Sequence, residues 1–536
     1  MNETFKRSRR WPLVLTLMCS LGLVACGSDD DEPEPQAVPE PTVRETAEGP
    51  VKGVEEVYGY SFKGIPYAAA PVGELRFAAP QSAPERDDTL DAGAFGNDCP
   101  QSGGAVGEAA VNEDCLFLNI YTPDDSTEAT HPVMVWIHGG AFVSGSGGAS
   151  YNPSRLVEEG VTVVTLNYRL GALGFMASPA LSAEQGASGN YGLLDQKAAL
   201  EWVQQNISHF GGDPEQVTIF GESAGGHSVM SLLVSPQTEG LFHRAIVQSG
   251  SYSPDKLALD AAEAKGTDFM SAVGCSDVDC LQALSVETIL SNQALVNEGF
   301  GPLPIFAPNA PILTQSIRSS LASSAFNKVP VLMGTNRDEY TLFTALSLVP
   351  NLDAAPIPET DYEAEVQKSY GPTLAPMLVN LYPLSDYDVA DPVRQATAAM
   401  ATDAGFACSA LTMATDLAKE VTTYVYEFAD RDAPLNLLPA RPANFELGAA
   451  HAFEIIYVLN TEEVMRQRGA TDAQVALSEQ MIDYWTSFAK NGTPNEAQWA
   501  TFGHSGELLE LNTPANQPLA AADFSSAHKC SFWTSF

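Results

Sequence analysis

The segment FGESAGGHSV, residues 220–229, contains the residue types that serine-based nucleophilic catalysis requires. Ser223 lies between Gly221 and Gly225, and His227 follows four residues after the serine. A serine hydroxyl becomes a strong nucleophile when a neighbouring base removes its proton. Residues four apart share one face of a helix, so His227 is the first candidate for that base. The alternative is a histidine that the fold brings in from a distant part of the chain.

The elements on either side of Ser223 favour the distant histidine. The apolar run QVTIF (216–220) predicts a strand that ends at the motif, and SAGGHSVMSLLV (223–234) predicts a helix after it. A G-x-S-x-G motif between a strand and a helix is typical of the nucleophile elbow, a sharp turn that exposes the serine hydroxyl. Ser223 then precedes the helix proper and points away from its axis. We therefore expect His227 to pack against or cap its neighbours.

A glycine-rich turn upstream could supply the hydrogen-bond donors for an oxyanion. HGGAF (138–142) follows a buried apolar strand, and its backbone N–H groups are little obstructed by side chains. Acyl transfer requires such donors where negative charge develops in the transition state. The N–H of Ala224, directly after the serine, is the second expected donor.

The base is sought among the histidines that follow Ser223, because in this type of fold the catalytic order is serine, acid, histidine. His243 leads into a strand, and His504 and His528 lie in a polar C-terminal tail. His451 lies in ELGAAHAFEI (446–455), among small residues that permit close approach. We therefore predict His451 as the base.

The acid should lie between the serine and that histidine, after a strand. The stretch VPVLMGTNRDEYTLF (329–343) supplies Asp338 and Glu339. Either carboxylate could orient an imidazole and stabilise its charged form. The residues alone leave these two candidates open.

The elements that must position these residues alternate between strands and helices. Apolar runs predict strands at 132–140, 161–169, 216–220, 244–250, 329–336 and 422–429. Residues 191–210 have apolar positions at helical spacing. Alternating strands and helices predict an α/β fold with a large, mostly parallel central sheet and helices on both faces. Without a repeat or a second linker, residues 49–536 are predicted to form one domain.

The N-terminus has a different character from the rest of the chain. Four basic residues within the first ten precede an apolar run, which predicts a signal peptide over residues 1–25. The sequence Leu23-Val24-Ala25-Cys26 resembles a bacterial lipobox, which implies lipidation of Cys26. Residues 26–48 are acidic and proline-rich, as expected of an extended tether. We expect an exported protein held at a bacterial membrane. Gly27, and not an aspartate, follows Cys26, and in this the sequence resembles lipoproteins sorted to the outer membrane.

Charge and cysteine content exclude several classes of protein. The formal net charge is −40, from 67 acidic and 27 basic residues, so no nucleic-acid partner is expected. Six cysteines lie beyond Cys26, which suggests three disulfides in an exported chain. Closeness in sequence favours Cys99–Cys115 and Cys275–Cys280, leaving Cys408–Cys530. No cysteine or histidine spacing predicts a metal site.

Several longer motifs resemble those of the type B carboxylesterases, the cholinesterase-like branch of the α/β-hydrolases. They include FKGIPYAAAPVGELRFAAP (62–80), EDCLFLNIYTP (113–123), NYRLGALGF (167–175) and the long run around the serine, 189–226. The resemblance extends from about residue 53 to the end of the chain. It implies an α/β-hydrolase fold, a carboxylic ester as substrate and no cofactor or metal. It also agrees with the three disulfide pairs.

The resemblance also assigns roles at the site. It implies Ser223 as nucleophile, His451 as base and Glu339 as acid, because the family uses the second member of its Asp-Glu pair. The oxyanion donors it implies are the N–H groups of Gly140, Ala141 and Ala224, where some relatives have three glycines in the upstream turn. Glu222 and Ser249 are the expected supporting residues.

Other functions of this scaffold remain open at this stage. The loop 100–114, between Cys99 and Cys115, has no aromatic residue. Choline-hydrolysing relatives hold the quaternary ammonium there by a cation–π contact, so a choline ester is not the expected substrate. The alternatives are a lipase acting on long-chain acyl esters and a non-catalytic adhesion-type homologue.

Overall fold

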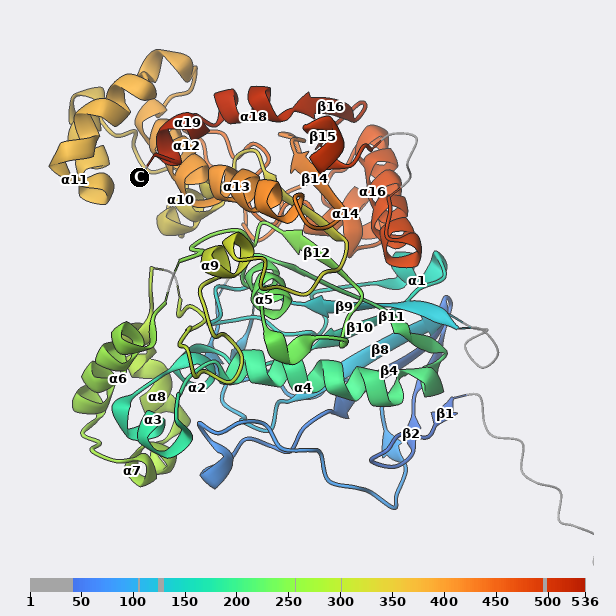
Figure 1. Ribbon diagram of the computed structural model, residues 1–536. Helices are drawn as coiled ribbons and strands as arrows, with labels where there is room; N and C mark the ends of the chain where they lie inside the picture. Colours follow the sequence, from blue (N-terminus) through green and yellow to red (C-terminus); the bar gives the residue numbers. More distant parts are fainter. Residues whose placement is uncertain are drawn as a thin grey trace, which may run out of the picture. The chain divides into compact units, whose positions relative to one another are not determined.

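The computed structural model describes residues 42–104, 107–123, 130–255, 257–299, 301–494 and 499–535. These residues belong to one compact unit, and the expected signal peptide, Cys26 and most of the expected tether lie outside them. An 11-stranded sheet crosses this unit (Figure 1). Its strands, in sheet order, are β16 (Gln517–Ala520), β15 (Glu507–Leu511), β14 (Thr423–Phe428), β13 (Val331–Asn336), β12 (Arg244–Gln248), β11 (Gly212–Glu222), β9 (His131–Ile137), β10 (Thr162–Leu166), β8 (Phe117–Pro123), β4 (Gly59–Pro66) and β3 (Val54–Glu56).

The middle of the sheet is parallel and its two edges are antiparallel. Every pairing from β10 through β9, β11, β12, β13 and β14 to β15 is parallel, whereas β8, β4, β3 and β16 pair antiparallel with their neighbours. The six strands expected from the sequence are all present, with ends that differ by a few residues. The predicted α/β fold with a mostly parallel sheet is therefore confirmed.

Helices cover both faces of this sheet. Those that matter most for the site are α1 (Ser154–Glu158), α4 (Tyr191–Asn206), α5 (Ala224–Leu233), α10 (Tyr340–Leu348), α12 (Pro392–Thr402), α13 (Cys408–Leu417), α14 (Ile455–Val458) and α16 (Asp472–Asn491). In Figure 1, α4 and α5 lie together against the central strands, whereas α16 lies apart from them, beside α1 and α14.

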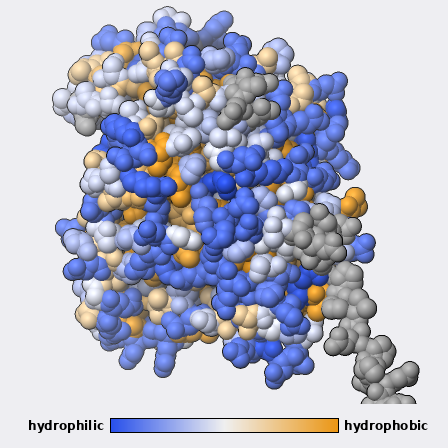
Figure 2. Space-filling model, turned by 45° about the vertical axis from the view of Figure 1, so that its right-hand side comes forward, coloured by the Kyte–Doolittle hydropathy of each residue, from blue (hydrophilic) through white to orange (hydrophobic). Residues whose placement is uncertain are grey.

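Strand alternation explains why the sheet needs helices on both faces. In β9, Val133 and Val135 belong to the core under α4, α5 and α13, whereas Met134 and Trp136 belong to the core under α14 and α16. All four side chains are fully buried. Successive strand residues point to opposite faces, so a strand that is apolar at every position must be covered on both sides. The face drawn in Figure 2 is mostly hydrophilic, with apolar residues gathered mainly in a hollow.

The start of the folded unit differs from the expected boundary at residue 49. Strand β1 (Val43–Arg44) pairs antiparallel with β2 (Val51–Lys52). The N–H of Ala47 donates to Asn206, and Trp202 donates to the carboxylate of Glu48. Residues 42–48 therefore belong to the folded unit, because strand pairing and these contacts hold a segment whose composition alone indicated a tether.

The structure joins the three cysteine pairs that the sequence analysis expected. Cys99–Cys115 and Cys275–Cys280 close short loops, and Cys408–Cys530 spans 122 residues with a Cα–Cα distance of 5.1 Å. No helix within the described residues is long and apolar enough to cross a membrane.

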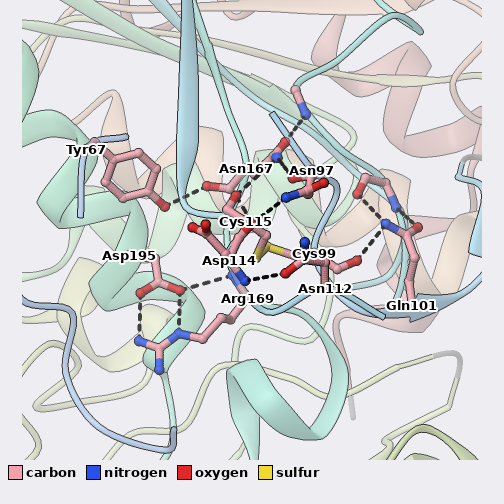
Figure 3. Close-up of a disulfide and its surroundings, with 12 residues drawn as sticks. Tyr67, Asn97, Cys99, Gln101, Asn112, Asp114, Cys115, Asn167, Arg169 and Asp195 are labelled. Carbon is pink, nitrogen blue, oxygen red and sulfur yellow. Dashed lines mark hydrogen bonds and ion pairs between the residues drawn. A yellow bond between two sulfur atoms is a disulfide. The ribbon is translucent and has the colours of Figure 1, made fainter. Parts of the chain in front are cut away.

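A buried ion pair anchors the segment that follows β10. The Arg169 guanidinium makes two hydrogen bonds to the Asp195 carboxylate, of 2.7 and 2.8 Å, and the Arg169 N–H donates to the same group (Figure 3). The two side chains are 3% and 0% exposed. A buried charge is tolerated when its partner satisfies it, so removing one partner leaves the other uncompensated.

Replacing Asp195 should therefore destabilise the protein strongly. We expect Asp195→Ala to lower the free energy of unfolding by about 3–5 kcal/mol, measured by urea denaturation. Glu201→Ala, on the same helix α4, is the matched control, since its ion pair with Lys197 leaves Glu201 52% exposed. That control should lose less than about 1 kcal/mol. Equal losses in the two variants would contradict this account of the buried pair.

Candidate active site

Ser223 lies at a sharp turn between β11 and α5. Its backbone has φ 56° and ψ −120°, a conformation that non-glycine residues rarely adopt. A Cβ atom at Gly225 would come within 1.9 Å of the Ile137 carbonyl oxygen at the end of β9, and one at Gly221 within 2.7 Å of the same atom. Only glycine permits that approach, which is why the elbow requires glycines two residues on either side of the serine.

The turn after β9 packs directly onto this elbow. Gly140 and Ala141 have φ values of 104° and 55°, so the chain turns through left-handed conformations there. A Cβ at Gly139 would lie 2.8 Å from the carbonyl oxygen of Glu222 and 3.1 Å from Cβ of Ser223. The expected oxyanion donors on Gly140, Ala141 and Ala224 thus belong to two segments in tight contact.

The first disulfide loop supports the same turn. The Gln101 amide accepts a hydrogen bond from the Gly145 N–H at 2.8 Å and donates to the Gly145 carbonyl at 3.0 Å. Gln101 is buried and follows Cys99 by two residues, so the Cys99–Cys115 disulfide fixes its backbone (Figure 3). The loop that carries the expected oxyanion donors is therefore held by the elbow on one side and by Gln101 on the other.

His451 is paired with Glu339 and not with Asp338. Nδ1 of His451 lies 2.5 Å from Oε2 of Glu339, and both residues are buried. The other oxygen of Glu339 accepts hydrogen bonds from the Thr335 hydroxyl and the Asn336 N–H. Glu339 lies just after β13, whereas His451 follows a long connection after β14.

Asp338 has a different and purely local set of contacts. Its carboxylate pairs with Arg431 at 3.0 Å and accepts a hydrogen bond from the Ala449 N–H at 2.9 Å. It therefore fixes the segment that leads to His451 without touching the imidazole. This geometry separates the two acids that the residues alone left open.

None of the other candidate histidines contacts the Glu339 carboxylate. Nδ1 of His227 is 3.3 Å from the Gly250 carbonyl, and its ring stacks on Tyr252, as expected of a packing residue. The His243 side chain, directly before β12, accepts a hydrogen bond from the Val217 N–H in β11. His504 is exposed. His528, however, is buried, although its polar surroundings in the sequence indicated an exposed tail.

Two further glutamates surround the His451 ring. Oε1 of Glu222 lies 3.1 Å from Nε2 of His451. Glu454, which the sequence analysis did not single out, accepts hydrogen bonds from Asn336 at 2.7 Å and Gln248 at 3.1 Å. Its position three residues after His451, in HAFE, was the only available signal in the sequence.

The protonation of His451 follows from these charges. Burial lowers the pKa of His451, but the carboxylates of Glu222, Glu339 and Glu454 outweigh it and raise that pKa to about 9. Burial raises the pKa of Glu339, whereas the charge of His451 and the hydrogen bonds from His451 and the Asn336 N–H lower it below its usual value. Burial raises the pKa of Glu222 and the charge of His451 opposes this, so the two groups titrate as a coupled pair in which the carboxylate is ionised when the imidazole is protonated.

Two cavities of unequal size adjoin the elbow. The smaller, about 290 Å³, is lined by Ser223, Ala141 and mostly apolar residues that include Phe142, Tyr252, Phe343 and Phe406. The rings of Phe343 and Phe406 also pack against the His451 ring, with centroid distances of 4.8 and 5.2 Å. Ser223 and His451 therefore adjoin the same aromatic wall.

The larger cavity, about 1000 Å³, lies against the oxyanion turn and Glu222. Its lining includes Asp98, Glu108 and Arg468 and is far more polar than that of the smaller cavity. The elbow is thus bordered by a small apolar space and a large polar one.

The fold and this site together define an α/β-hydrolase. The carboxylesterase family matches residues 40–533. The para-nitrobenzyl esterase of Bacillus subtilis (strain 168) is 36% identical over 468 residues, covering 84% of this chain and 90% of that protein. The acylcarnitine hydrolase of Mus musculus is 34% identical over 546 residues, covering 95% and 92%. A solved thermophilic PNB esterase is similar with a TM-score of 0.75 and 34% identity, covering 91% of this chain and all of that one.

The chain therefore belongs to the carboxylesterase family, as the sequence motifs indicated. It is a carboxylic ester hydrolase of type B, and its α/β-hydrolase fold matches the solved esterases.

The charges around His451 predict how its titration responds to mutation. Glu222→Gln removes a negative charge 3.1 Å from Nε2, so the pKa of His451 should fall. A base works when neutral, so the acid limb of the kcat/KM profile should move to lower pH by about one unit or more. The measurement is kcat/KM for p-nitrophenyl acetate from pH 5 to pH 10.

Glu201→Gln, a change to an exposed carboxylate, is the control and should leave the acid limb in place. An acid limb that stays fixed, or moves to higher pH, in Glu222→Gln would refute the assigned charge coupling.

Proposed function

We propose that this protein hydrolyses short-chain carboxylic esters through an acyl-enzyme on Ser223, with His451 as base and Glu339 as acid. The supporting observation is the 2.5 Å contact between His451 and Glu339, at the aromatic wall of the cavity that Ser223 adjoins. The similarity to the para-nitrobenzyl esterase of Bacillus subtilis (strain 168) supports ester hydrolysis as the chemistry.

The first half-reaction forms the acyl-enzyme. His451 Nε2 takes the proton of the Ser223 hydroxyl as its oxygen attacks the ester carbonyl carbon. The carbonyl oxygen becomes an oxyanion, which the N–H groups of Gly140, Ala141 and Ala224 stabilise. The bond to the alcohol oxygen then breaks, and His451 gives the proton to the departing alcohol.

The second half-reaction regenerates the enzyme. Water attacks the acyl carbon while His451 takes one of its protons, and the acid leaves as the proton returns to the Ser223 oxygen. Glu339 keeps the imidazole in the tautomer that leaves Nε2 free to accept a proton. Glu339 also stabilises the imidazolium in both halves.

The two cavities support separate binding sites for the acyl part and the alcohol part of the ester. The cavity of about 290 Å³ suits a short acyl chain, because it is small and its lining is mostly apolar. The polar cavity of about 1000 Å³ suits the alcohol part. A long-chain lipase would need a longer apolar channel beside Ser223.

A panel of p-nitrophenyl esters from acetate to palmitate tests this proposal. We expect acetate and butyrate to exceed palmitate in kcat/KM by at least about tenfold, because the acyl cavity is small. Ser223→Ala should lower kcat by at least about 10⁴-fold and abolish labelling by a fluorophosphonate. Ser271→Ala, an exposed serine on helix α6 (Leu259–Val273), is the matched control.

Full activity in Ser223→Ala would overturn the assigned nucleophile. A palmitate optimum would favour the lipase alternative, and folded wild-type protein that neither labels nor hydrolyses any ester would favour the non-catalytic one.

We also propose that lipid on Cys26 holds the exported enzyme at a bacterial membrane, outside the cytoplasm. The basic start, the apolar run and the sequence Leu23-Val24-Ala25-Cys26 support this placement. Three disulfides in the folded unit agree with an exported protein, because disulfides persist in oxidising compartments.

Cys26→Ser should release this enzyme from the membrane fraction. Loss of the lipid removes the apolar chains that partition into the bilayer. The measurement is esterase activity in membrane and supernatant fractions after ultracentrifugation. Cys19→Ser, within the expected signal peptide, is the control; a membrane-bound Cys26→Ser protein would disprove the anchor.

A further inference from the structure

A buried histidine near the C-terminus bridges two carboxylates outside the triad. Nδ1 of His528 lies 2.6 Å from Oδ1 of Asp403, and Nε2 lies 2.8 Å from Oε1 of Glu427. The three residues are 5%, 4% and 2% exposed. We call Asp403, Glu427 and His528 the C-terminal clamp.

The clamp is built for a positively charged imidazole. The second oxygen of Asp403 accepts a hydrogen bond from the Tyr382 hydroxyl, and the second oxygen of Glu427 accepts one from Arg337. Each carboxylate thus has one oxygen left to face a ring nitrogen of His528, and an imidazolium, which donates from both nitrogens, fits this arrangement. Burial lowers the pKa of His528, but the two carboxylates outweigh it and raise that pKa to about 9.

Other charged groups face the clamp from the surrounding elements. Arg337 also pairs with Glu510 on β15 at 2.5 Å, and Lys529 acts on Asp403 with its positive charge. Trp533, in helix α19 (Cys530–Trp533), donates to the Tyr382 hydroxyl at 2.7 Å. The C-terminal segment is thereby tied to the edge of the sheet by a continuous polar network.

Asp403 connects the C-terminal clamp to the wall of the active site. Asp403 is the first residue of η7 (Asp403–Ala407), a single π-helical turn between α12 and α13. Phe406, three residues later in that turn, lines the cavity that contains Ser223. Its ring lies 5.2 Å from the His451 ring and 5.6 Å from the Tyr252 ring.

Glu427 connects the C-terminal clamp to the segment that carries Glu339. Glu427 lies on β14, and its partner Arg337 precedes Glu339 by two residues. The Arg337 N–H also donates to the Phe428 carbonyl at 2.9 Å. His528 therefore joins the segment that bears Phe406 to the segment that bears Glu339.

We propose that His528 is a positioning residue of this esterase, which holds η7 against β14 and so keeps Phe406 in place as the wall of the acyl cavity. The identity of that cavity as the acyl site rests on the proposed function. His528 itself touches neither substrate nor the reacting groups, so it acts through Phe406.

The neighbouring disulfide does not replace this contact. Cys408 follows η7 directly and is joined to Cys530, two residues after His528. The disulfide thus fixes the end of η7, whereas His528 fixes its beginning through Asp403. Without His528, the start of the turn is held only by its continuity with α12, and the buried Asp403 loses its partner, so the side chain of Phe406 can shift.

The test is the acyl selectivity of His528→Gln, taken as the ratio of kcat/KM for p-nitrophenyl hexanoate to that for p-nitrophenyl acetate. A loss of folded enzyme lowers both constants equally and leaves this ratio unchanged. A displaced Phe406 enlarges the cavity, so we expect the ratio to rise about threefold to tenfold. His504→Gln, an exposed histidine in the same C-terminal region, is the matched control and should keep the wild-type ratio.

A double-mutant cycle with Phe406→Ala shows whether the effect passes through Phe406. We expect Phe406→Ala to raise the ratio by itself, and His528→Gln to change it no further in that background. An unchanged ratio in His528→Gln, or two effects that multiply in the double variant, would overturn the proposal.

A substitute variant and a labelling control complete the experiment. If His528→Gln does not fold, Asp403→Asn takes its place in the cycle, because it replaces the carboxylate that Nδ1 of His528 contacts with a neutral amide; an unchanged ratio there overturns the proposal equally. Fluorophosphonate labelling of Ser223 is measured on every preparation. Absent labelling and hydrolysis in the wild type would refute the proposed function, whereas normal labelling with an unchanged ratio refutes only the role of His528.

Discussion

The burial of one imidazole among three glutamates is the constraint on which the site depends. His451 can remain in a dry interior next to Glu222, Glu339 and Glu454 only because these groups share charge and hydrogen bonds with it. That arrangement requires segments from the ends of β11 and β13 and from the connection after β14 to meet at one edge of the sheet. The parallel order of these strands brings those ends together.

Much of this arrangement could be predicted from local patterns. Six of the seven strands of the parallel core contain a short apolar run and were expected, as were helices α4 and α5. The seventh strand, β15, has the sequence Glu-Leu-Leu-Glu-Leu and was not expected. The glycines around Ser223 also had a local cause, because the elbow presses against the end of β9. The choice between Asp338 and Glu339 could not be made from the residues, since both follow β13 and only the path of the chain turns one toward His451.

Other features escaped sequence reasoning because their partners are far away. His528 stands among polar residues in a short tail, and nothing nearby indicates that Asp403 and Glu427 enclose it. Residues 42–48 have the composition of a tether, yet strand pairing with 51–52 includes them in the fold. In each case composition describes the segment correctly, and long-range hydrogen bonds decide where it lies.

The position of His528 and Cys530 in the chain has a consequence for biosynthesis. His528 follows Asp403 by 125 residues and Cys530 follows Cys408 by 122, so each partner is made well before the residue that bonds to it. Their partners, Asp403 and Cys408, border the turn that carries the Phe406 wall. A growing or truncated chain therefore lacks the bonds that close this wall, and the disulfide forms only where cysteines are oxidised. The order of synthesis thus delays the finished wall until His528 and Cys530 have both been made and the disulfide has formed.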